Sequence, residues 1–231
     1  TPVTRADREA ELLIRRRITE RFPHDAVLGE EYGVSGGTGT RTWVVDPIDG
    51  TKSFVAGAPL YAVLIGLVDG SYAGEEIATD RVLAGVVHIP ATRETVSAAR
   101  GCGTVWEVDG SPRRTAAVSS TDRFSGARIG TSDFADLARR EPALFARVAD
   151  GGGVTRTWGD AYGYLLVATG RMDAMVDPIV SPWDIAPLPV VIEEAGGRYT
   201  DLAGRAVLGT SAAATNRRLH DHLLTDAPSA D

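Results

Sequence analysis

Two aspartates follow an apolar run in the segment from Trp43 to Thr51, which reads W-V-V-D-P-I-D-G-T. The apolar residues are typical of the end of a buried strand, and Pro47 lacks the N–H group that a strand ladder needs to continue. Gly50 permits a tight turn into a short helix, so Asp46 and Asp49 should converge at the strand end. Carboxylates beside exposed backbone N–H groups suit a hard divalent cation together with a phosphate. An Asx turn that only caps a helix would have the same composition.

Two further segments favour a metal and phosphate site. Residues 27–31 read V-L-G-E-E, a short apolar strand that ends in acids. Residues 183–197 begin with W-D-I-A, continue as an apolar, helix-like run and end with E-E-A-G-G. A second G-E-E, at residues 74–76, follows a polar stretch and leads into no apolar strand, so we expect it to be a surface loop.

In this order, G-E-E, D-P-I-D-G-T, W-D-I-A and E-A-G-G resemble the signature of the inositol monophosphatase superfamily, from Thr4 to about Leu224. Within it, residues 1–7, 49–54, 157–164 and 181–188 are most similar to the histidinol-phosphate phosphatase branch. The resemblance implies an α/β (α+β) fold, the layered α-β-α-β-α sandwich of the inositol monophosphatase and fructose-1,6-bisphosphatase type.

The resemblance also implies a set of metal ligands. Carboxylates in contact raise each other's pKa, so a cluster of acids at element ends requires bound cations. Two or three Mg²⁺ ions would meet that requirement. The first metal would be held by Glu30, Asp46 and the backbone carbonyl of Ile48, and the second by Asp46, Asp49 and Asp184.

Three further roles follow from the same resemblance. Gly50 and Thr51 would offer backbone N–H groups to the phosphate at a helix N-terminus. Asp7, beside the Thr51 hydroxyl, would orient and deprotonate the attacking water. The resemblance gives Glu30 a catalytic role in addition to its role as a metal ligand. Because bound metals lower the pKa of water, a strong side-chain base is unnecessary.

The leaving group should meet acids from the second half of the chain. Asp177 stands seven residues before Asp184, a position that approaches the leaving group in this superfamily, and Asp160 is the second candidate. Asp184 should also face the substrate. Two acids suit the amine and imidazole of histidinol, whereas a cyclitol needs only hydroxyl acceptors. Alternatively, Asp177 and the proline that follows it would only form a turn.

The predicted function is therefore a magnesium-dependent phosphomonoesterase that hydrolyses L-histidinol phosphate to L-histidinol and phosphate with a metal-activated water. One alternative is a phosphatase for inositol, another cyclitol or a sugar phosphate, including one that serves a specialised biosynthetic pathway. Another is a catalytically silent binding protein of the same fold. The complete set of acids speaks against the silent protein, because binding alone would not require every ligand.

Composition sets broad limits on partners and setting. The chain has 231 residues, 43% of them hydrophobic, and a net charge of -7, which argues against nucleic acid and anionic membranes as general partners. Lone Cys102 allows no internal disulfide, and no apolar stretch approaches the length of a membrane span. We expect a cytoplasmic homodimer acting on a small phosphate monoester. Because the chain begins at Thr1 without a methionine, inside a motif, we also expect a preceding segment.

Periodicity predicts the order of elements. A helix should start at Thr4 and Asp7, bury an apolar stripe that includes Leu12 and Leu13, and end at Pro23, with residues 15–17 as a solvated arginine face. Antiparallel strands are predicted over 61–68, 82–89, 94–98 and 104–108. Short strands and helices should then alternate over 127–130, 142–148, 161–169, 172–176 and 183–195. We expect a metal-binding lobe over 1–122 and an α/β lobe over 123–231, forming one catalytic unit. The stretch 71–81 is longer than a hairpin of this branch requires.

Overall fold

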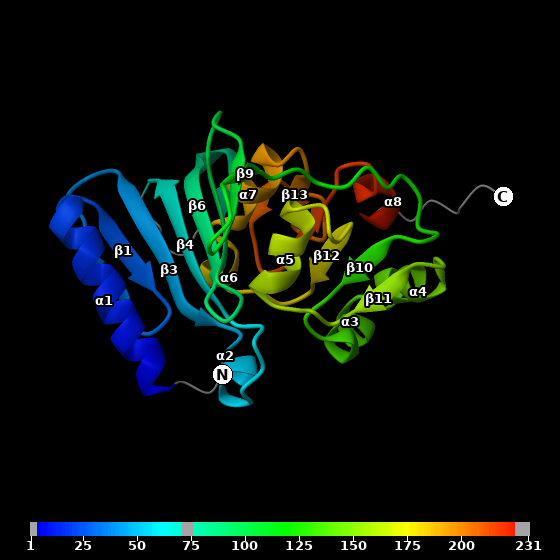
Figure 1. Cartoon of the computed structure of the whole chain (residues 1–231), viewed down its shortest axis with the longest axis horizontal. Coiled ribbons are helices and arrows are strands. Elements are labelled where there is room, and N and C mark those ends of the chain that lie inside the picture. The colour runs from blue at the N-terminus through cyan, green and yellow to red at the C-terminus, as the bar shows by residue number, and fades with distance from the viewer. Residues whose placement is uncertain (1–3, 71–75, 225–231) are drawn as a thin grey trace.

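The computed structural model describes residues 4–70 and 76–224, and a large sheet dominates its N-terminal half (Figure 1). The strand order is β2-β1-β3-β4-β6-β7-β8-β9, and β1 and β3 form its parallel pair. The strands are β1 (Ala26–Gly29), β2 (Gly33–Gly36), β3 (Arg41–Asp49), β4 (Ala62–Asp69), β6 (Val82–Ile89), β7 (Glu94–Ala99), β8 (Thr104–Val108) and β9 (Arg114–Thr115). The four predicted antiparallel strands are confirmed as β4, β6, β7 and β8.

A second sheet comes from the C-terminal half, in the order β11-β10-β12-β15-β13. Its strands are β10 (Arg128–Gly130), β11 (Val154–Arg156), β12 (Ala174–Asp177), β13 (Arg198–Thr200) and β15 (Ala212–Thr215). A small ladder pairs β5 (Ile77–Ala78) with β14 (Val207–Leu208), so the end of the long 71–81 stretch is a strand and a 3-10 turn (Thr79–Arg81) that contact the other half. Residues 71–75 lie outside the described residues. A lobe boundary near residue 122 stays a prediction.

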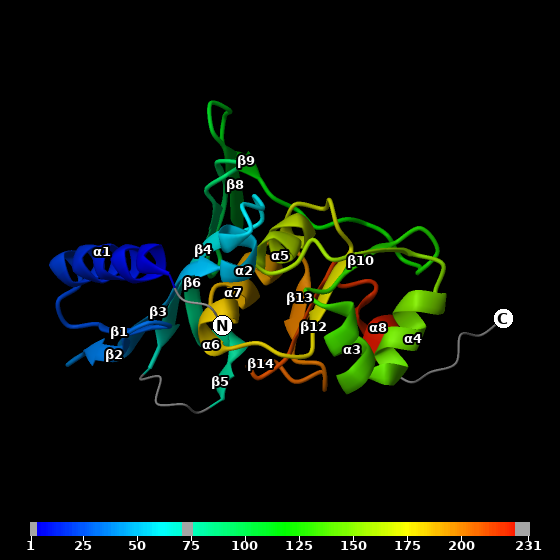
Figure 2. The ribbon, with the colours of Figure 1, turned by 90° about the horizontal axis from the view of Figure 1, so that it is seen from below.

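Helices form three layers around the two sheets, which confirms the predicted α-β-α-β-α sandwich (Figures 1 and 2). α1 (Arg5–Arg21) covers β1 and β3 on one outer face. Between the sheets lie α5 (Ala161–Ala168), α6 (Pro182–Ile185) and α7 (Leu188–Glu194). The other outer face carries α3 (Phe134–Arg140), α4 (Pro142–Asp150) and α8 (His220–Leu224).

Side-chain alternation explains why the second sheet is covered on both faces. In β12, Met175 packs toward α5 and α7, while Ala174 and Val176 pack toward α3, α4 and α8. The apolar run of α5 is almost entirely buried, as expected for a helix held between two sheets.

The start of α1 is as predicted, but its buried face is not. The Thr4 hydroxyl accepts from the N–H of Asp7, and an Asp7 oxygen accepts from the N–H of Thr4 at 2.8 Å, which is a capping box. The predicted apolar stripe is wrong at Leu12 and Leu13, which are about half exposed (52% and 49%). The predicted solvated face is also wrong at Arg15, which is buried. The buried residues are Asp7, Glu11, Arg15 and Ile18.

The predicted continuous helix over 183–195 is also wrong, because it is divided into α6 and α7. Pro187 stands at the break and has no N–H for a helical hydrogen bond. The break packs directly on the large sheet, where Gly66 and Gly85 face each other on β4 and β6. A Cβ at Gly85 would lie 2.6 Å from the Pro187 oxygen, and one at Gly66 would lie 2.8 Å from Ala186. The glycine pair therefore sets how closely α6 approaches the sheet.

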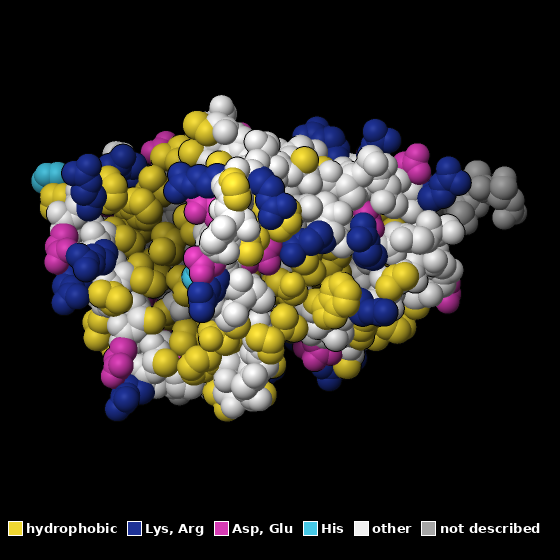
Figure 3. Space-filling model, in the orientation of Figure 1, with side chains coloured by type: hydrophobic (Ala, Val, Ile, Leu, Met, Phe, Trp, Pro, Cys, Tyr) yellow, Lys and Arg dark blue, Asp and Glu magenta, His cyan; other side chains and the backbone are white. Residues whose placement is uncertain are grey.

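The opposite face of the large sheet is hollowed beside α1 and lined by apolar side chains (Figure 3). The hollow has a volume of about 370 Å³, and its lining includes Trp43, Ile65, Val86, Ser97 and Val105. In the part of the chain that the structure describes, no helix has both the length and the apolarity to cross a membrane.

The glycine pair generates a stability prediction. Gly85→Ala should lower the free energy of unfolding by roughly 1–3 kcal/mol, because the added methyl overpacks against Pro187. Urea unfolding of both proteins measures this change. Ser97→Thr adds one methyl in the open hollow on the other face, so its unfolding free energy should change by less than about 0.5 kcal/mol. Equal changes in the two variants would show that the close approach of α6 is not what the glycine permits.

Candidate active site

The site forms where β1 and β3 end side by side. The two strands run parallel, with Gly29 opposite Val45, so Glu30 emerges beside Asp46. Strand β3 does not stop at Pro47 as predicted. It continues to Asp49. Its pairing with β4 shifts register after Asp46, because Pro47 cannot supply an N–H group to the ladder.

The segment after Pro47 combines a turn with a ligand set. An Asp46 oxygen accepts from the N–H of Ile48 at 2.9 Å, the contact of an Asx turn. The turn that the sequence left as an alternative is thus present inside the acidic cluster, and it orients one Asp46 oxygen.

A third carboxylate arrives from the α6 layer. Asp184 is held in a capping box, where one of its oxygens accepts from the N–H of Ser181 at 2.8 Å. Asp46, Asp49 and Asp184 each place an oxygen within 4.8 Å of the others. Glu30 lines the same cavity. The donors are all oxygens, the set that Mg²⁺ prefers, so the residues fit the predicted metal.

Burial and mutual repulsion make the ionised cluster unstable by itself. Burial, followed by the charges of Asp184 and Glu31, raises the pKa of Glu30 to about 7. Burial, followed by the charge of Asp160, raises the pKa of Asp184 to about 6. The pKa values of Asp46 and Asp49 are raised well above their usual range, again first by burial and then by neighbouring carboxylates. Divalent cations would relieve this repulsion.

The carboxylates open into one cavity of about 170 Å³ at the N-terminal end of α2 (Thr51–Val55). Its lining contains most of the predicted site residues: Glu30, Asp46, Ile48, Asp49, Gly50, Thr51, Asp160 and Asp184. Lys52, Ser181 and Trp183 also line it and were not predicted. Their positions beside Thr51 and Asp184 in the sequence were the available signal.

Asp7 on α1 contacts the cavity residue Thr51, which is 44 residues away in the sequence. The Thr51 hydroxyl oxygen lies 3.3 Å from an Asp7 oxygen and 3.1 Å from the Ile48 carbonyl, so its one proton can be donated to either. Both side chains are buried. The structure therefore brings the predicted pair together next to the carboxylates.

Asp160 has an unusual backbone. Its φ of 51° and ψ of -154° fall in a region that is almost exclusive to glycine. The conformation is held on both sides, since the Asp160 N–H donates to the Ser132 hydroxyl at 2.9 Å and the Ala161 N–H donates to Asp49 at 2.6 Å. Gly50 leaves room for the carboxylate, because a Cβ there would lie 2.8 Å from an Asp160 oxygen. The strain thus places a carboxylate over Gly50.

Asp177 lies outside the cavity lining. It is fully buried at the end of β12, where one oxygen accepts from the Ser132 N–H at 2.7 Å and the other from the Tyr164 hydroxyl at 2.7 Å. Its carboxylate therefore supports Ser132, which in turn accepts from Asp160.

Two other acidic motif residues do not line the cavity. Glu31 does not line the cavity, and its N–H donates to Glu11. Glu76, the last residue of the second G-E-E, forms an exposed ion pair with Arg205 at 2.8 Å. Gly74 and Glu75 of that motif lie outside the described residues.

The chain matches the inositol monophosphatase family over residues 1–231. A histidinol-phosphatase of Mycobacterium tuberculosis is 42% identical, over 97% of this chain and 84% of its own length. A histidinol-phosphatase of Chlorobaculum parvum is 40% identical, over 89% of this chain and 74% of its own length. The solved structure of Mycobacterium tuberculosis SuhB has a TM-score of 0.76 at 33% identity and covers 94% of this chain and 81% of its own. With the layered fold and the carboxylate cavity, these matches show that the chain belongs to the inositol monophosphatase family.

Proposed function

We propose that this protein is a magnesium-dependent phosphatase that hydrolyses L-histidinol phosphate to L-histidinol and phosphate. The observation that carries the proposal is the cavity in which buried carboxylates for metal face a strained carboxylate, Asp160, suited to a cationic leaving group. The two histidinol-phosphatases that are 40–42% identical to the chain support the same substrate.

The acidic residues divide into two proposed ligand sets. Glu30, Asp46 and the Ile48 carbonyl would hold one Mg²⁺, and Asp46, Asp49 and Asp184 a second, with room for two or three ions in all. When bound, Mg²⁺ supplies positive charge for the phosphate and makes water more acidic. The pKa values of these acids are raised first by burial and then by neighbouring carboxylates, and a bound cation would relieve that second, repulsive contribution.

The remaining residues orient the reactants. The N–H groups of Gly50 and Thr51 would hold phosphate oxygens at the start of α2. The Thr51 hydroxyl would accept a hydrogen bond from the attacking water, and Asp7 beside it would receive the proton. The water oxygen forms a bond to phosphorus as the bond to the histidinol oxygen breaks, and that oxygen takes up a proton.

The leaving group would meet Asp160 directly. Asp160 lines the cavity, so its carboxylate can pair with the amine or imidazole of histidinol. Asp177 would contribute by holding Ser132, which fixes the backbone of Asp160. Asp184, which lines the same cavity, would face both metal and substrate.

A phosphatase for inositol, another cyclitol or a sugar phosphate would use the same carboxylates and phosphate contacts, so it differs from our proposal only at Asp160. A silent binding protein is disfavoured by the complete cluster of Glu30, Asp46, Asp49 and Asp184, together with the Asp7 and Thr51 pair. We further propose that the enzyme acts in the cytoplasm as a homodimer.

The function is tested by phosphate release from histidinol phosphate, inositol phosphates and sugar phosphates, each with Mg²⁺ or with a chelator. Histidinol phosphate should give the highest kcat/KM, and the chelator should abolish turnover. Asp46→Asn should reduce turnover by more than the roughly 10- to 100-fold typical of residues that only support a ligand. Its thermal unfolding should remain cooperative. Unchanged Mg²⁺-dependent turnover in the folded variant would exclude the site.

The raised pKa values predict how stabilisation by Mg²⁺ depends on pH. The protonated forms of Glu30 and Asp184 favour the metal-free fold, and this contribution is lost as pH rises through about 6 and then about 7. Mg²⁺ binds the ionised forms, so the difference in thermal midpoint between Mg²⁺ and chelator should grow from about pH 5.5 to about pH 8. Buried His220, whose pKa is lowered to about 4, titrates in both samples and cancels from the difference. A difference that is constant or shrinks over this range would contradict the assignment.

Substrate choice is tested at Asp160. Asp160→Asn keeps the side-chain size and removes the charge, so histidinol phosphate should lose roughly 1–3 kcal/mol of transition-state stabilisation. An inositol phosphate and a generic aryl phosphate should lose much less. Asp160→Gly should have the same effect on selectivity but should raise the free energy of unfolding by up to roughly 1–3 kcal/mol, because glycine relieves the backbone strain. An unchanged substrate ratio in both variants would refute the role of the carboxylate.

A further inference from the structure

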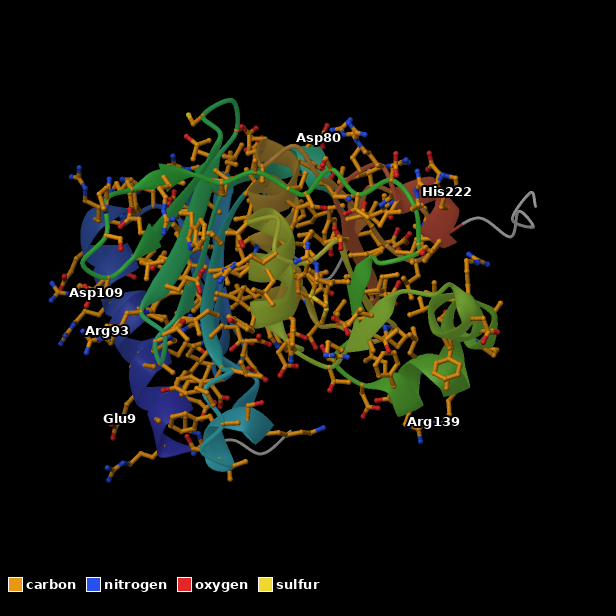
Figure 4. The ribbon with its side chains drawn as sticks, turned by 45° about the vertical axis from the view of Figure 1, so that its right-hand side comes forward. Glu9, Asp80, Arg93, Asp109, Arg139 and His222 are labelled. Carbon is orange, nitrogen blue, oxygen red and sulfur yellow. The ribbon has the colours of Figure 1, made fainter. Side chains whose placement is uncertain are left out.

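The buried face of α1 carries charged residues at intervals of four. Asp7, Glu11 and Arg15 lie one above another on the face that meets the large sheet. Glu9, on the other side of the helix, points into solvent (Figure 4). Asp7 contacts Thr51 at the cavity, whereas Glu11 and Arg15 have no part in the proposed reaction.

Glu11 contacts the segment that carries Glu30. Its side chain is fully buried, and one carboxylate oxygen accepts from the Glu31 N–H at 2.7 Å. The other oxygen accepts from the Tyr32 N–H at 3.3 Å. Glu11 therefore fixes the peptide that directly follows Glu30. Gly29 makes room for it, because a Cβ at Gly29 would lie only 2.1 Å from a Glu11 oxygen.

Arg15 completes the contact from the next turn of α1. Its Nε donates to Glu11 at 2.7 Å, and one terminal nitrogen donates to the Val27 carbonyl at 3.2 Å and the Ser35 hydroxyl at 2.5 Å. The other terminal nitrogen donates to the Gly33 carbonyl. The pair thus holds both strands of the β1–β2 hairpin, with Glu30 and Glu31 in its turn.

Stability alone gives little reason for this arrangement. A buried ion pair loses about as much hydration energy as it gains by attraction, and apolar residues often replace one without loss of stability. A carboxylate that accepts from two successive N–H groups, however, fixes the position of a turn. Because Asp7 is on the same face of α1, the helix also sets the distance between the Asp7–Thr51 pair and Glu30.

We propose that Glu11 is a positioning residue for the metal site. It holds the Glu30–Glu31 peptide against α1, so that the Glu30 carboxylate is directed at Asp46 and at the first Mg²⁺. Arg15 keeps the Glu11 carboxylate oriented. The inference rests on the proposed function, because it assumes that Glu30 is a metal ligand.

Calorimetric Mg²⁺ binding to the intact protein tests this role without relying on turnover. Glu11→Ala should weaken Mg²⁺ binding by roughly 10- to 100-fold, as expected when a group that supports a ligand is lost. Glu11→Gln should weaken it less, because the amide oxygen can still accept from the Glu31 N–H. At saturating Mg²⁺, KM for histidinol phosphate should stay near the wild-type value, because the substrate contacts are untouched.

Asp173 provides a matched control. It is buried in the second sheet and accepts from the Arg128 N–H at 2.7 Å and from the Arg128 side chain at 3.4 Å. It stands next to the first residue of β12, whereas Asp177 ends that strand. Asp173→Asn therefore weakens the contact of a buried carboxylate with a partly exposed arginine, away from the cavity, and should lower the thermal midpoint without changing Mg²⁺ affinity. An equal loss of affinity in the Asp173 and Glu11 variants would overturn the proposal.

Gly29→Ala displaces the Glu11 carboxylate without altering it, and together with Glu11→Gln it carries the test if Glu11→Ala does not fold. Wild-type Mg²⁺ affinity in folded Glu11 and Gly29 variants would overturn the inference. Glu30→Gln separates this failure from that of the proposed function. If Glu30→Gln weakens Mg²⁺ binding and the Glu11 variants do not, only the positioning role is wrong. If Glu30→Gln binds Mg²⁺ normally, the ligand assignment is wrong and the inference fails with it.

Discussion

Repulsion between carboxylates that are fully or partly buried is the constraint on which the rest of this structure depends. Glu30, Asp46, Asp49 and Asp184 come from separate segments and meet at one small cavity. Their raised pKa values show that the fold holds them together against both desolvation and like charge. Such a cluster needs rigid support in the absence of cations, and each segment that carries one of the acids has it.

The supports are of different physical kinds. Parallel pairing of β1 and β3 brings Glu30 next to Asp46, and an Asx turn fixes one Asp46 oxygen. The capping box at Ser181 holds Asp184, while the Gly66–Gly85 pair lets the following Ala186 and Pro187 lie against the sheet. All of these supports rely on backbone hydrogen-bonding groups or on glycines, which have no side chain. Burial of apolar side chains by itself would therefore not produce the site.

The sequence predicted the parts of this arrangement that depend on local patterns. Strands β4, β6 and β7 alternate in burial, and the cavity residues stand in short motifs at the ends of strands and at the starts of helices, so both could be identified without the fold. The errors arose where tertiary contacts override local preference. Leu12 and Leu13 face outward because the inner face of α1 is occupied by charged groups that contact the β1–β2 turn and Thr51. No periodicity of apolar residues could have indicated that face, although the spacing of four between Asp7 and Glu11 could have indicated it.

The position of Asp177 outside the cavity lining depends on contacts with Ser132 and Tyr164. Ser132 is remote in the sequence, and Tyr164 lies in an apolar helix, so neither contact could be read from a local pattern.

The residues proposed for catalysis and the residue proposed for substrate choice are held in place by different parts of the fold. The metal and water residues lie on the ends of β1 and β3, on α1 and on α6, whereas Asp160 is held in its strained conformation by Ser132 and by its own connection to α5. The two systems meet at Gly50, which leaves space for the Asp160 carboxylate, and at Asp49, which accepts from the Ala161 N–H. A change at Asp160 can therefore alter the leaving group that is accepted while the carboxylate cluster stays in place. A change at Gly50 cannot be so contained, because any side chain there would displace Asp160 and also alter the backbone proposed to hold the phosphate.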